Sequence, residues 1–399
     1  MSSARAGPNG RHPWSEEARR ARLDALQHTL SRALPNLALA LEDSETLKGQ
    51  IENFVGVIRV PVGVAGPLQV CGEAAQGAFH IPLATTEGTL VLAVSRGAAA
   101  ITAAGGATVV ASDPEVSRAP LFAFASGAAA RRAAEWVCGQ LEALRTATMT
   151  TTRYGRLVRV EPLLIGRRLV LRFVYDTADA AGQNMVTLAT AAACDWLRRA
   201  EPFAGVELFS IETNVSRDKK LGTLAPAERR GRRVDAEVIV PRYVISRVFH
   251  ADPEALARIA REGLYSGAIS GAVGAQAQFA NTMAAIFLAT GQDVATVVEA
   301  GTGLTVMETT ARGDLYASIT IPNMVCGTVG GGTRLPSQQE CLAILGCAGA
   351  GHARKFAALV GAAVLAGELA LVAALATDTF AQAHATFGRP ARRLDGAAG

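Results

Sequence analysis

Four isolated polar residues have the side-chain types needed to reduce a carbonyl group. They lie far apart in apolar or small-residue surroundings: Glu87 in "ATTEGTL", Lys219 in "NVSRDKK", Asp293 in "ATGQD" and His384 in "AQAHATFG". A lysine can stabilise a developing oxyanion, and a protonated carboxylic acid can donate a proton. A histidine can protonate a leaving thiolate, and a carboxylate can keep a lysine charged. Each residue alone is more often a helix cap or surface group, and spacing does not show that the four meet.

The stretch 211–223, "IETNVSRDKKLGT", concentrates charge around the lysine. Its charged residues include Glu212, Asp218, Lys219 and Lys220, flanked by small and apolar residues. The pattern fits a solvated charge cluster, and it also fits a catalytic lysine held by an acid. The residues themselves leave both interpretations open.

Composition excludes several other classes of function. The chain has 399 residues, 50% of them hydrophobic, so it can bury a large core, and its length fits two domains. A net charge of +4 is too small to indicate a nucleic-acid surface. The six cysteines form no CxxC pair, which favours reduced thiols in a cytoplasm over a disulfide framework or a zinc site. No P-loop, GxSxG or HExxH motif occurs, and we predict no metal site.

The glycine run "GTVGGGT" at 327–333 is a second candidate feature. It lacks the GxGxxG spacing of a dinucleotide-binding turn. Its backbone amides could cradle a phosphate or nucleotide, and a flexible turn would have the same composition.

The elements that must position these residues begin after a tail. Residues 1–14 have no apolar signal core, and we expect them to be disordered. Residues 14–34 predict a helix that Ser15 can cap. Residues 51–70 predict short strands and tight turns, and residues 87–106 predict a helix of small residues.

Residues 119–211 have a different texture, with a helix, two strands, a helix and a strand. Helices return over 212–399, including a long apolar one at 352–377. Glu368 in its middle favours a buried core helix over a membrane span. We predict an α+β fold in which a small, ferredoxin-like α+β domain (119–211) is inserted in a large helix-rich one (15–118 and 212–389), followed by a flexible tail (390–399).

A series of motifs, taken in order, resembles one family, the 3-hydroxy-3-methylglutaryl-CoA (HMG-CoA) reductases. They cover most of residues 45–389 and are "ENFVGVIRVPVGVAGPL", "PLATTEGTLVLAVSRGAAAI", "DTADAAGQNMVT", "NVSRDKK", "ANTMAAIFLATGQD", "GTVGGGTRLPSQQECLAILG" and "ARKFAALVGAAVLAGELALVAALA". The "DKK" form and the inserted domain look like the catalytic portion of the class I enzymes, without a membrane anchor.

This resemblance implies an activity. The large domain would bind acyl-CoA and the inserted domain the nicotinamide cofactor. The family converts HMG-CoA to mevalonate and CoA in two hydride transfers from NADPH. By the same resemblance we expect a cytoplasmic homodimer or homotetramer.

The resemblance also assigns roles to the four polar residues. Glu87 matches the glutamate that donates protons to the carbonyl oxygen, and Lys219 matches the lysine that stabilises the oxyanion. Asp293 matches the aspartate that couples these two. His384 matches the histidine that protonates the departing CoA thiolate.

Cofactor and substrate positions carry over in the same way. Thr152 and Arg153 match the residues that hold the adenosine 2′-phosphate, and an arginine there favours NADPH over NADH. The other cofactor positions are Asp179, Gly182, Gln183, Asn184, Gly327, Gly330, Gly331 and Arg389. The substrate positions are Arg96 near the CoA phosphates, Arg118 at the hydroxyglutaryl end, Asp218, Lys220 and Asn281.

Three positions depart from the family pattern. Glu212 replaces a serine that helps to bind the substrate carboxylate, and Glu262 (or Arg261, one position earlier) aligns with a substrate-binding lysine. Ala178 replaces a glycine before the cofactor aspartate. A glutamate would put like charge near the acyl carboxylate unless it is protonated or turned away. Two alternatives therefore stay open: the same reduction of a different acyl-CoA, or a non-catalytic paralogue.

Overall fold

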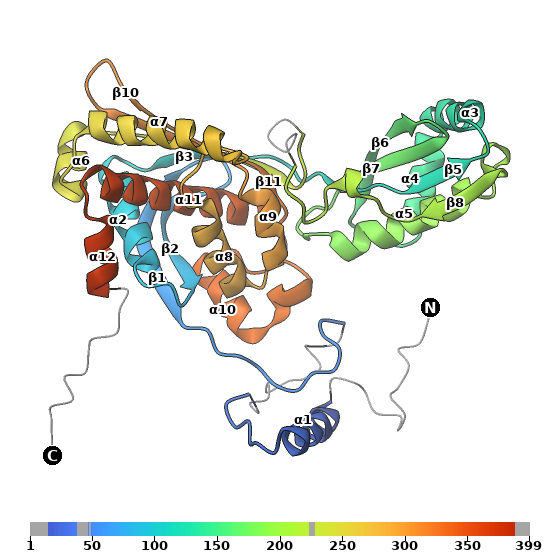
Figure 1. The fold of residues 1–399 in the computed structure, drawn as a ribbon, viewed down its shortest axis with the longest axis horizontal. Helices are drawn as coiled ribbons and strands as arrows, with labels where there is room; N and C mark the ends of the chain where they lie inside the picture. Colours follow the sequence, from blue (N-terminus) through green and yellow to red (C-terminus); the bar gives the residue numbers. More distant parts are fainter. Residues whose placement is uncertain (1–14, 38–46, 48, 223–227, 388–399) are drawn as a thin grey trace.

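The computed structural model describes residues 15–37, 47, 49–222 and 228–387. The predicted terminal tails, 1–14 and 390–399, lie outside the described residues. A larger and a smaller lobe lie side by side, and helix α1 (Glu16–Leu30) lies below the larger one (Figure 1). Ser15 caps α1 by accepting a hydrogen bond from the Ala18 N–H at 3.2 Å, which confirms the predicted cap.

The large lobe is built on a six-stranded sheet in the order β10-β11-β9-β3-β1-β2. All neighbours are antiparallel except β1 and β3. The strands are β1 (Val62–Cys71), β2 (Gln76–Ala84), β3 (Ala107–Ala111), β9 (Arg232–Val240), β10 (Leu304–Thr309) and β11 (Leu315–Met324). The expectation that residues 212–399 return to helices missed β9, β10 and β11. In β9 buried and more accessible residues alternate, a strand signal that lies in the sequence "RRVDAEVIV".

Helices complete the large lobe and surround one central helix, α11 (Ala353–Ala376). The others are α2 (Leu90–Ala103), α6 (Arg242–Phe249), α7 (Pro253–Ser270), α8 (Phe279–Thr290), α9 (Val297–Ala300), α10 (Pro336–Ile344) and α12 (Phe380–Phe387). Helices α2 and α11 pack closely at Gly97, which has no side chain. A Cβ there would lie 1.8 Å from the carbonyl oxygen of Ala366. Among the described helices, α11 alone is long and apolar enough to span a membrane, and 83% of its apolar window is buried in the protein.

Glu368 lies in the middle of α11 and is fully buried. Its carboxylate accepts hydrogen bonds from the Gln278 N–H at 2.6 Å, the Ala277 N–H at 2.9 Å and the Thr305 hydroxyl at 2.6 Å. Burial raises the pKa of this carboxyl, and these hydrogen bonds oppose the shift. The glutamate therefore joins the core helix to the start of α8 and to β10, as expected for a core helix.

The small lobe has a five-stranded antiparallel sheet in which β4, β5 and β6 all pair with β7, and β5 also pairs with β8. Its elements are β4 (Val116–Arg118), β5 (Leu121–Phe124), α3 (Gly127–Cys138), α4 (Leu141–Met149), β6 (Arg156–Ile165), β7 (Arg168–Asp176), α5 (Gln183–Leu197) and β8 (Val206–Ser210). The lobe has its own apolar core. From β5 to β8, with α3 and α4 as the first helical connection, the order is the β-α-β-β-α-β of a ferredoxin-like unit, and β4 is an additional strand. The predicted α+β class is confirmed.

The chain enters and leaves the small lobe at one place. The Thr213 hydroxyl donates a hydrogen bond to the Ala119 carbonyl oxygen at 2.9 Å. Nearby, Glu115 and Gly231 form a backbone bridge, with N–H to O distances of 3.0 and 2.6 Å. The two crossings therefore run beside each other.

Candidate active site

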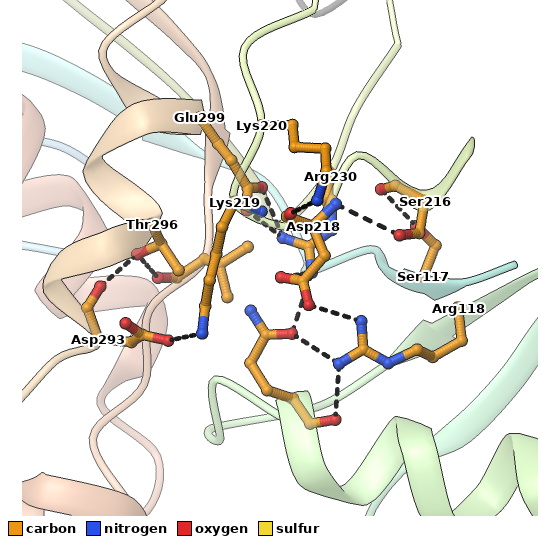
Figure 2. Close-up of polar contacts among 12 residues, drawn as sticks. Ser117, Arg118, Ser216, Asp218, Lys219, Lys220, Arg230, Asp293, Thr296 and Glu299 are labelled. Carbon is orange, nitrogen blue, oxygen red and sulfur yellow. Dashed lines mark hydrogen bonds and ion pairs between the residues drawn. The ribbon is translucent and has the colours of Figure 1, made fainter. Parts of the chain in front are cut away.

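Lys219 and Asp293 form an ion pair at the protein surface. The Lys219 Nζ lies 2.8 Å from Asp293 Oδ2, and the side chains are 43% and 36% exposed (Figure 2). Asp293 follows α8, which ends at Gly291 in the left-handed conformation (φ 69°). The other oxygen of Asp293 caps the next helical turn by accepting from the Ala295 N–H at 3.1 Å. The aspartate is thus held in place while one oxygen faces the lysine.

The backbone around Lys219 is unusual. Arg217 and Lys219 have φ values of 57° and 55°, in the left-handed region. Such residues cost roughly 1–3 kcal/mol each and persist only where surrounding contacts hold them. One such contact is the Lys219 N–H, which donates to Glu299 Oε1 at 2.5 Å.

Arg230 is the centre of a buried hydrogen-bond network beside this turn. Its side chain is 1% exposed, and its Nη1 lies 2.5 and 2.6 Å from the two oxygens of Glu299 on α9. Its Nη2 donates to Asp218 Oδ1 at 2.9 Å and to Gln183 Oε1 at 3.0 Å. Burial raises the pKa of the Glu299 carboxyl, while Arg230 and the Lys219 N–H oppose this shift.

Arg118 adds a second guanidinium to the network. Its Nη1 lies 2.8 Å from Asp218 Oδ2 and 3.4 Å from Glu212 Oε2, and its Nε donates to Thr187 at 2.7 Å. Figure 2 shows Asp218 between Arg230 and Arg118. Burial alone would raise the pKa of Asp218, but the two guanidiniums hold it below its usual range. Asp218 is therefore ionised.

Glu212 belongs to the same network. Its Oε1 accepts from the Thr213 N–H at 2.7 Å, and its Oε2 faces the Ala119 N–H as well as Arg118, each at 3.4 Å. Lys220 is exposed and donates from Nζ to the Asp218 main-chain oxygen at 3.1 Å. The charged residues Glu212, Asp218 and Lys219 thus belong to an organised ion network, with Lys220 at its solvated edge.

Glu87 lies in a second cluster. The Asn281 Nδ2 donates to both carboxyl oxygens, at 2.9 and 3.1 Å. Both residues line a cavity of about 330 Å³ between α2, α8, α11 and α12, together with Arg96 and apolar side chains. Arg96 donates to the Val248 carbonyl oxygen at 3.1 Å, and burial lowers its pKa.

Helix α12 covers part of this cavity and carries His384. Ala383, the preceding residue, lines the cavity with Glu87. The side chain of His384, and all of Arg389, lie outside the described part of the structure.

The two clusters stand at opposite ends of α8. Asn281 lies in its first turn, and Asp293 follows its last, so 12 residues of helix, or about 18 Å, separate the ends. Among the described residues, no hydrogen bond or ion pair joins Glu87 to Lys219 or Asp293. Within one chain the structure therefore joins Lys219 to Asp293, while Glu87 meets the predicted substrate residue Asn281.

The predicted cofactor positions meet where the two lobes touch. Ala180 forms a backbone bridge with Val329, beside the glycine run. A Cβ on Gly327 would lie 2.4 Å from the Ala181 nitrogen, so this approach requires glycine. Gly182 precedes α5 with φ 78°, and Gln183 and Asn184 form its first turn.

The other cofactor positions are more exposed. No atom of the described residues lies within 4 Å of a Cβ placed on Gly330 or Gly331. Thr152 accepts hydrogen bonds from the Tyr154 and Gly155 N–H groups, at 3.3 and 3.1 Å. Arg153 in the same turn is exposed.

Several residues of the site were not predicted from the sequence. Gln292 accepts from the Gly327 N–H and donates to its carbonyl oxygen, both at 2.9 Å. Arg230 and Glu299 hold the lysine turn, and their only sequence signals are a basic run, "ERRGRR", and an acid in the apolar "TVVEAG". No group of His, Cys, Asp and Glu in the described part of the chain could hold a metal ion.

The chain is similar to known proteins over nearly its whole length. The sequence profile of the hydroxymethylglutaryl-coenzyme A reductases matches residues 17–389. The chain is 43% identical to 3-hydroxy-3-methylglutaryl-coenzyme A reductase of Pyrococcus abyssi over 96% of this chain and 94% of that protein. It is 44% identical to the protein of the same name from Methanocaldococcus jannaschii over 88% of this chain and 87% of that protein.

Solved structures show the same fold. The class II 3-hydroxy-3-methylglutaryl-CoA reductase from Streptococcus pneumoniae, bound to NADPH in open conformations, superposes with a TM-score of 0.65 and 21% identity. The superposition covers 89% of this chain and 96% of that one. Sequence and fold agree with the motifs: the chain belongs to the hydroxymethylglutaryl-coenzyme A reductase family of oxidoreductases.

Proposed function

We propose that the protein reduces HMG-CoA to mevalonate and free CoA with NADPH, and that Lys219 and Asp293 form the catalytic pair. The observation that carries the pair is the 2.8 Å contact between Lys219 Nζ and Asp293 Oδ2 at an accessible surface. An aspartate at this distance holds the lysine Nζ in place through an ion pair. A charged lysine stabilises the oxyanion that forms when hydride adds to the thioester carbonyl, and again at the aldehyde stage.

Proton transfer is assigned to the cavity cluster. Asn281 contacts both oxygens of Glu87 and orients a carboxyl group that lines the cavity. In its protonated form Glu87 donates a proton to the reduced carbonyl oxygen. His384, on the helix that covers the cavity, protonates the CoA thiolate as it leaves, so that the released thiol does not add back.

The residues between the lobes fit NADPH, which supplies hydride when bound. The first turn of α5 carries no acidic residue, so its N–H groups and dipole favour a phosphate. The open side of Gly330 and Gly331 leaves the glycine run accessible, and Arg153 offers a guanidinium to a 2′-phosphate. The Gln183 Nε2 is buried without a partner among the described residues, and an acceptor on the cofactor would satisfy it.

Two departures from the family pattern have explanations compatible with this activity. The charge of Glu212 faces Arg118 and two backbone N–H groups, which offset part of its repulsion of an acyl carboxylate. This supports HMG-CoA over a different acyl-CoA. Ala178 adopts φ 50°, the conformation for which a glycine is better suited, at a cost of about 1 kcal/mol. The third departure, Glu262, is exposed on α7.

A homodimer or homotetramer in the cytoplasm is part of the proposal. The separation of the two clusters along α8 supports it, because a second copy could bring Glu87 and Asn281 of one protomer to Lys219 and Asp293 of the other. All six cysteines are unpaired, as expected in a reducing compartment.

The test is the stoichiometry of the purified protein. We expect two NADPH oxidised for each CoA released, with mevalonate as product. A Lys219→Ala variant should be inactive under the same conditions. A panel of neutral and cationic acyl-CoAs tests the acyl preference. No acyl-CoA-dependent NADPH oxidation by the wild type would sink the proposal and favour a non-catalytic paralogue.

A further inference from the structure

We propose that Arg230 and Glu299 are positioning residues for Lys219, acting through its backbone and through Asp218. This inference rests on the proposed role of Lys219. Neither residue is accessible to a substrate, since the side chains are 1% and 3% exposed. Any influence on the reaction must therefore pass through the atoms that they hold.

The backbone of Lys219 is held by a contact from outside its own turn. The left-handed turn at this residue needs an external contact to hold it, and its N–H donates to Glu299 at 2.5 Å. The lysine side chain is 43% exposed and has little packing to fix its direction. The direction from which Nζ approaches Asp293 therefore depends on the backbone anchor.

The Arg230–Glu299 ion pair anchors two successive residues, Asp218 and Lys219. Arg230 neutralises Glu299 with Nη1 and reaches Asp218 with Nη2 at 2.9 Å (Figure 2). Asp218 precedes Lys219, so removal of the pair would release both the lysine N–H and its neighbour. A lysine in place of Arg230 has no planar fork with which to make both contacts.

Elements of both lobes meet at this ion pair. Arg230 Nη2 also donates to Gln183 Oε1 at 3.0 Å, the first residue of α5, and its main-chain N–H donates to Asn323 on β11 at 2.7 Å. Because Arg118 also faces Gln183 Oε1, at 3.4 Å, two donors fix the orientation of that amide. The same guanidinium thus joins the proposed cofactor side of the site to the lysine turn.

Stability alone is a weak reason for such a pair. Buried ion pairs are often no more stable than well-packed apolar residues of similar volume, because desolvation offsets the attraction. Removal of one partner is much worse, since it leaves an unpaired buried charge. Replacing Arg230 and Glu299 together leaves no unpaired buried charge. A loss of activity in such a variant can therefore be distinguished from a loss of the fold.

The experiment compares two double variants in the full chain, R230M/E299L and R230M/E299Q. Both lack the ion pair, but the glutamine keeps an oxygen that can accept from the Lys219 N–H. We expect both to fold, judged by thermal unfolding. We expect kcat of R230M/E299L to fall about 100-fold, the scale of a 1 Å misplacement, and the R230M/E299Q value to fall less. Arg233→Met is the control. It removes an exposed arginine of β9 that pairs with Asp235, and it should leave kcat unchanged.

A second readout is the kinetic isotope effect with NADPH deuterated at the transferred position. A misplaced lysine slows the hydride step, so the effect should rise in R230M/E299L and less in R230M/E299Q. Equal kcat and isotope effects in the two double variants would overturn the proposal. Loss of the fold in both would also overturn it, because the pair would then serve the core. A wild type without HMG-CoA reduction would instead refute the proposed function.

Discussion

The carboxylate of Asp179 caps the helix that begins at Ala353. Asp179 Oδ1 accepts from the Ala353 N–H at 3.0 Å, and its Oδ2 accepts from the Gly351 N–H at 2.7 Å. Asp179 belongs to the segment between β7 and α5 in the small lobe, whereas α11 is the core helix of the large lobe. Both carboxylate oxygens are engaged, so Asp179 docks the loop that carries Gly182 and Gln183 onto the start of α11.

Asp179→Ala should therefore weaken cofactor binding indirectly. Loss of the cap is expected to lower the free energy of unfolding by about 1 kcal/mol. The KM for NADPH should rise more than the KM for HMG-CoA, because the loop is no longer fixed. Asp179→Asn keeps one acceptor oxygen and serves as the milder variant. Equal rises in both KM values would contradict this docking role.

Asp293→Asn removes the negative partner of Lys219 without changing its size. The rate constant kcat should fall about 100-fold, the scale seen when one group that stabilises an oxyanion is lost. Lys220→Ala is the matched comparison, because Lys220 is exposed and contacts only a main-chain oxygen among the described residues. Lys220→Ala should raise the KM for HMG-CoA and leave kcat near the wild-type value. A larger fall in kcat in Lys220→Ala than in Asp293→Asn would show that Lys220, and not Lys219, stabilises the oxyanion.

Glu212→Gln tests the effect of this acid on substrate charge. The carboxylate lies 3.4 Å from Arg118 and is 31% exposed, so its removal leaves the site more positive. The KM for the anionic HMG-CoA should fall severalfold, with little change in kcat, and the gain should shrink at high salt. An unchanged KM at every salt concentration would show that Glu212 is electrostatically neutral to the substrate.

Asp218 gives the fold a dependence on pH with a defined sign. Its pKa lies below the usual range in the folded protein because Arg230 and Arg118 outweigh the effect of burial. A depressed folded-state pKa stabilises the fold above the unfolded-state value, about 3.9, and this contribution is lost as pH falls through the folded-state value. Asp218→Asn should thus lower the unfolding free energy at pH 7 by about 2 kcal/mol, the scale of hydrogen bonds to charged groups. Denaturant unfolding at several pH values should show the difference shrinking only in acid.

Gly97→Ala probes the crossing of α2 and α11. The added Cβ would lie 1.8 Å from the Ala366 carbonyl oxygen, so the helices must separate. We expect a loss of about 3 kcal/mol in unfolding free energy. The control is Gly263→Ala on the exposed surface of α7, where no described atom lies within 4 Å of the new Cβ. There the better helix propensity of alanine should stabilise the protein by about 1 kcal/mol.

The sequence predicted those elements whose signal is local. The Ser15 cap and the long helix around Glu368 follow from short-range patterns, and both are present. Strands β9 to β11 were missed because their alternation lies in a region dominated by alanine-rich helical segments. Lys219 and Asp293 were paired by resemblance and do meet. Arg230 and Glu299 could not be predicted, because their contact joins residues 69 positions apart and nothing local records it.

The hydrogen bond from Thr213 to Ala119 makes the inserted unit modular. Because the two ends of the segment lie together, a foreign domain with similarly spaced ends could occupy the same place without stretching the sheet of the large lobe. The lysine turn begins after Thr213, outside the exchanged segment, and would remain with its host. Exchange of this segment, through recombination or by design, would thus alter the small lobe while the lysine turn stays in the parent protein.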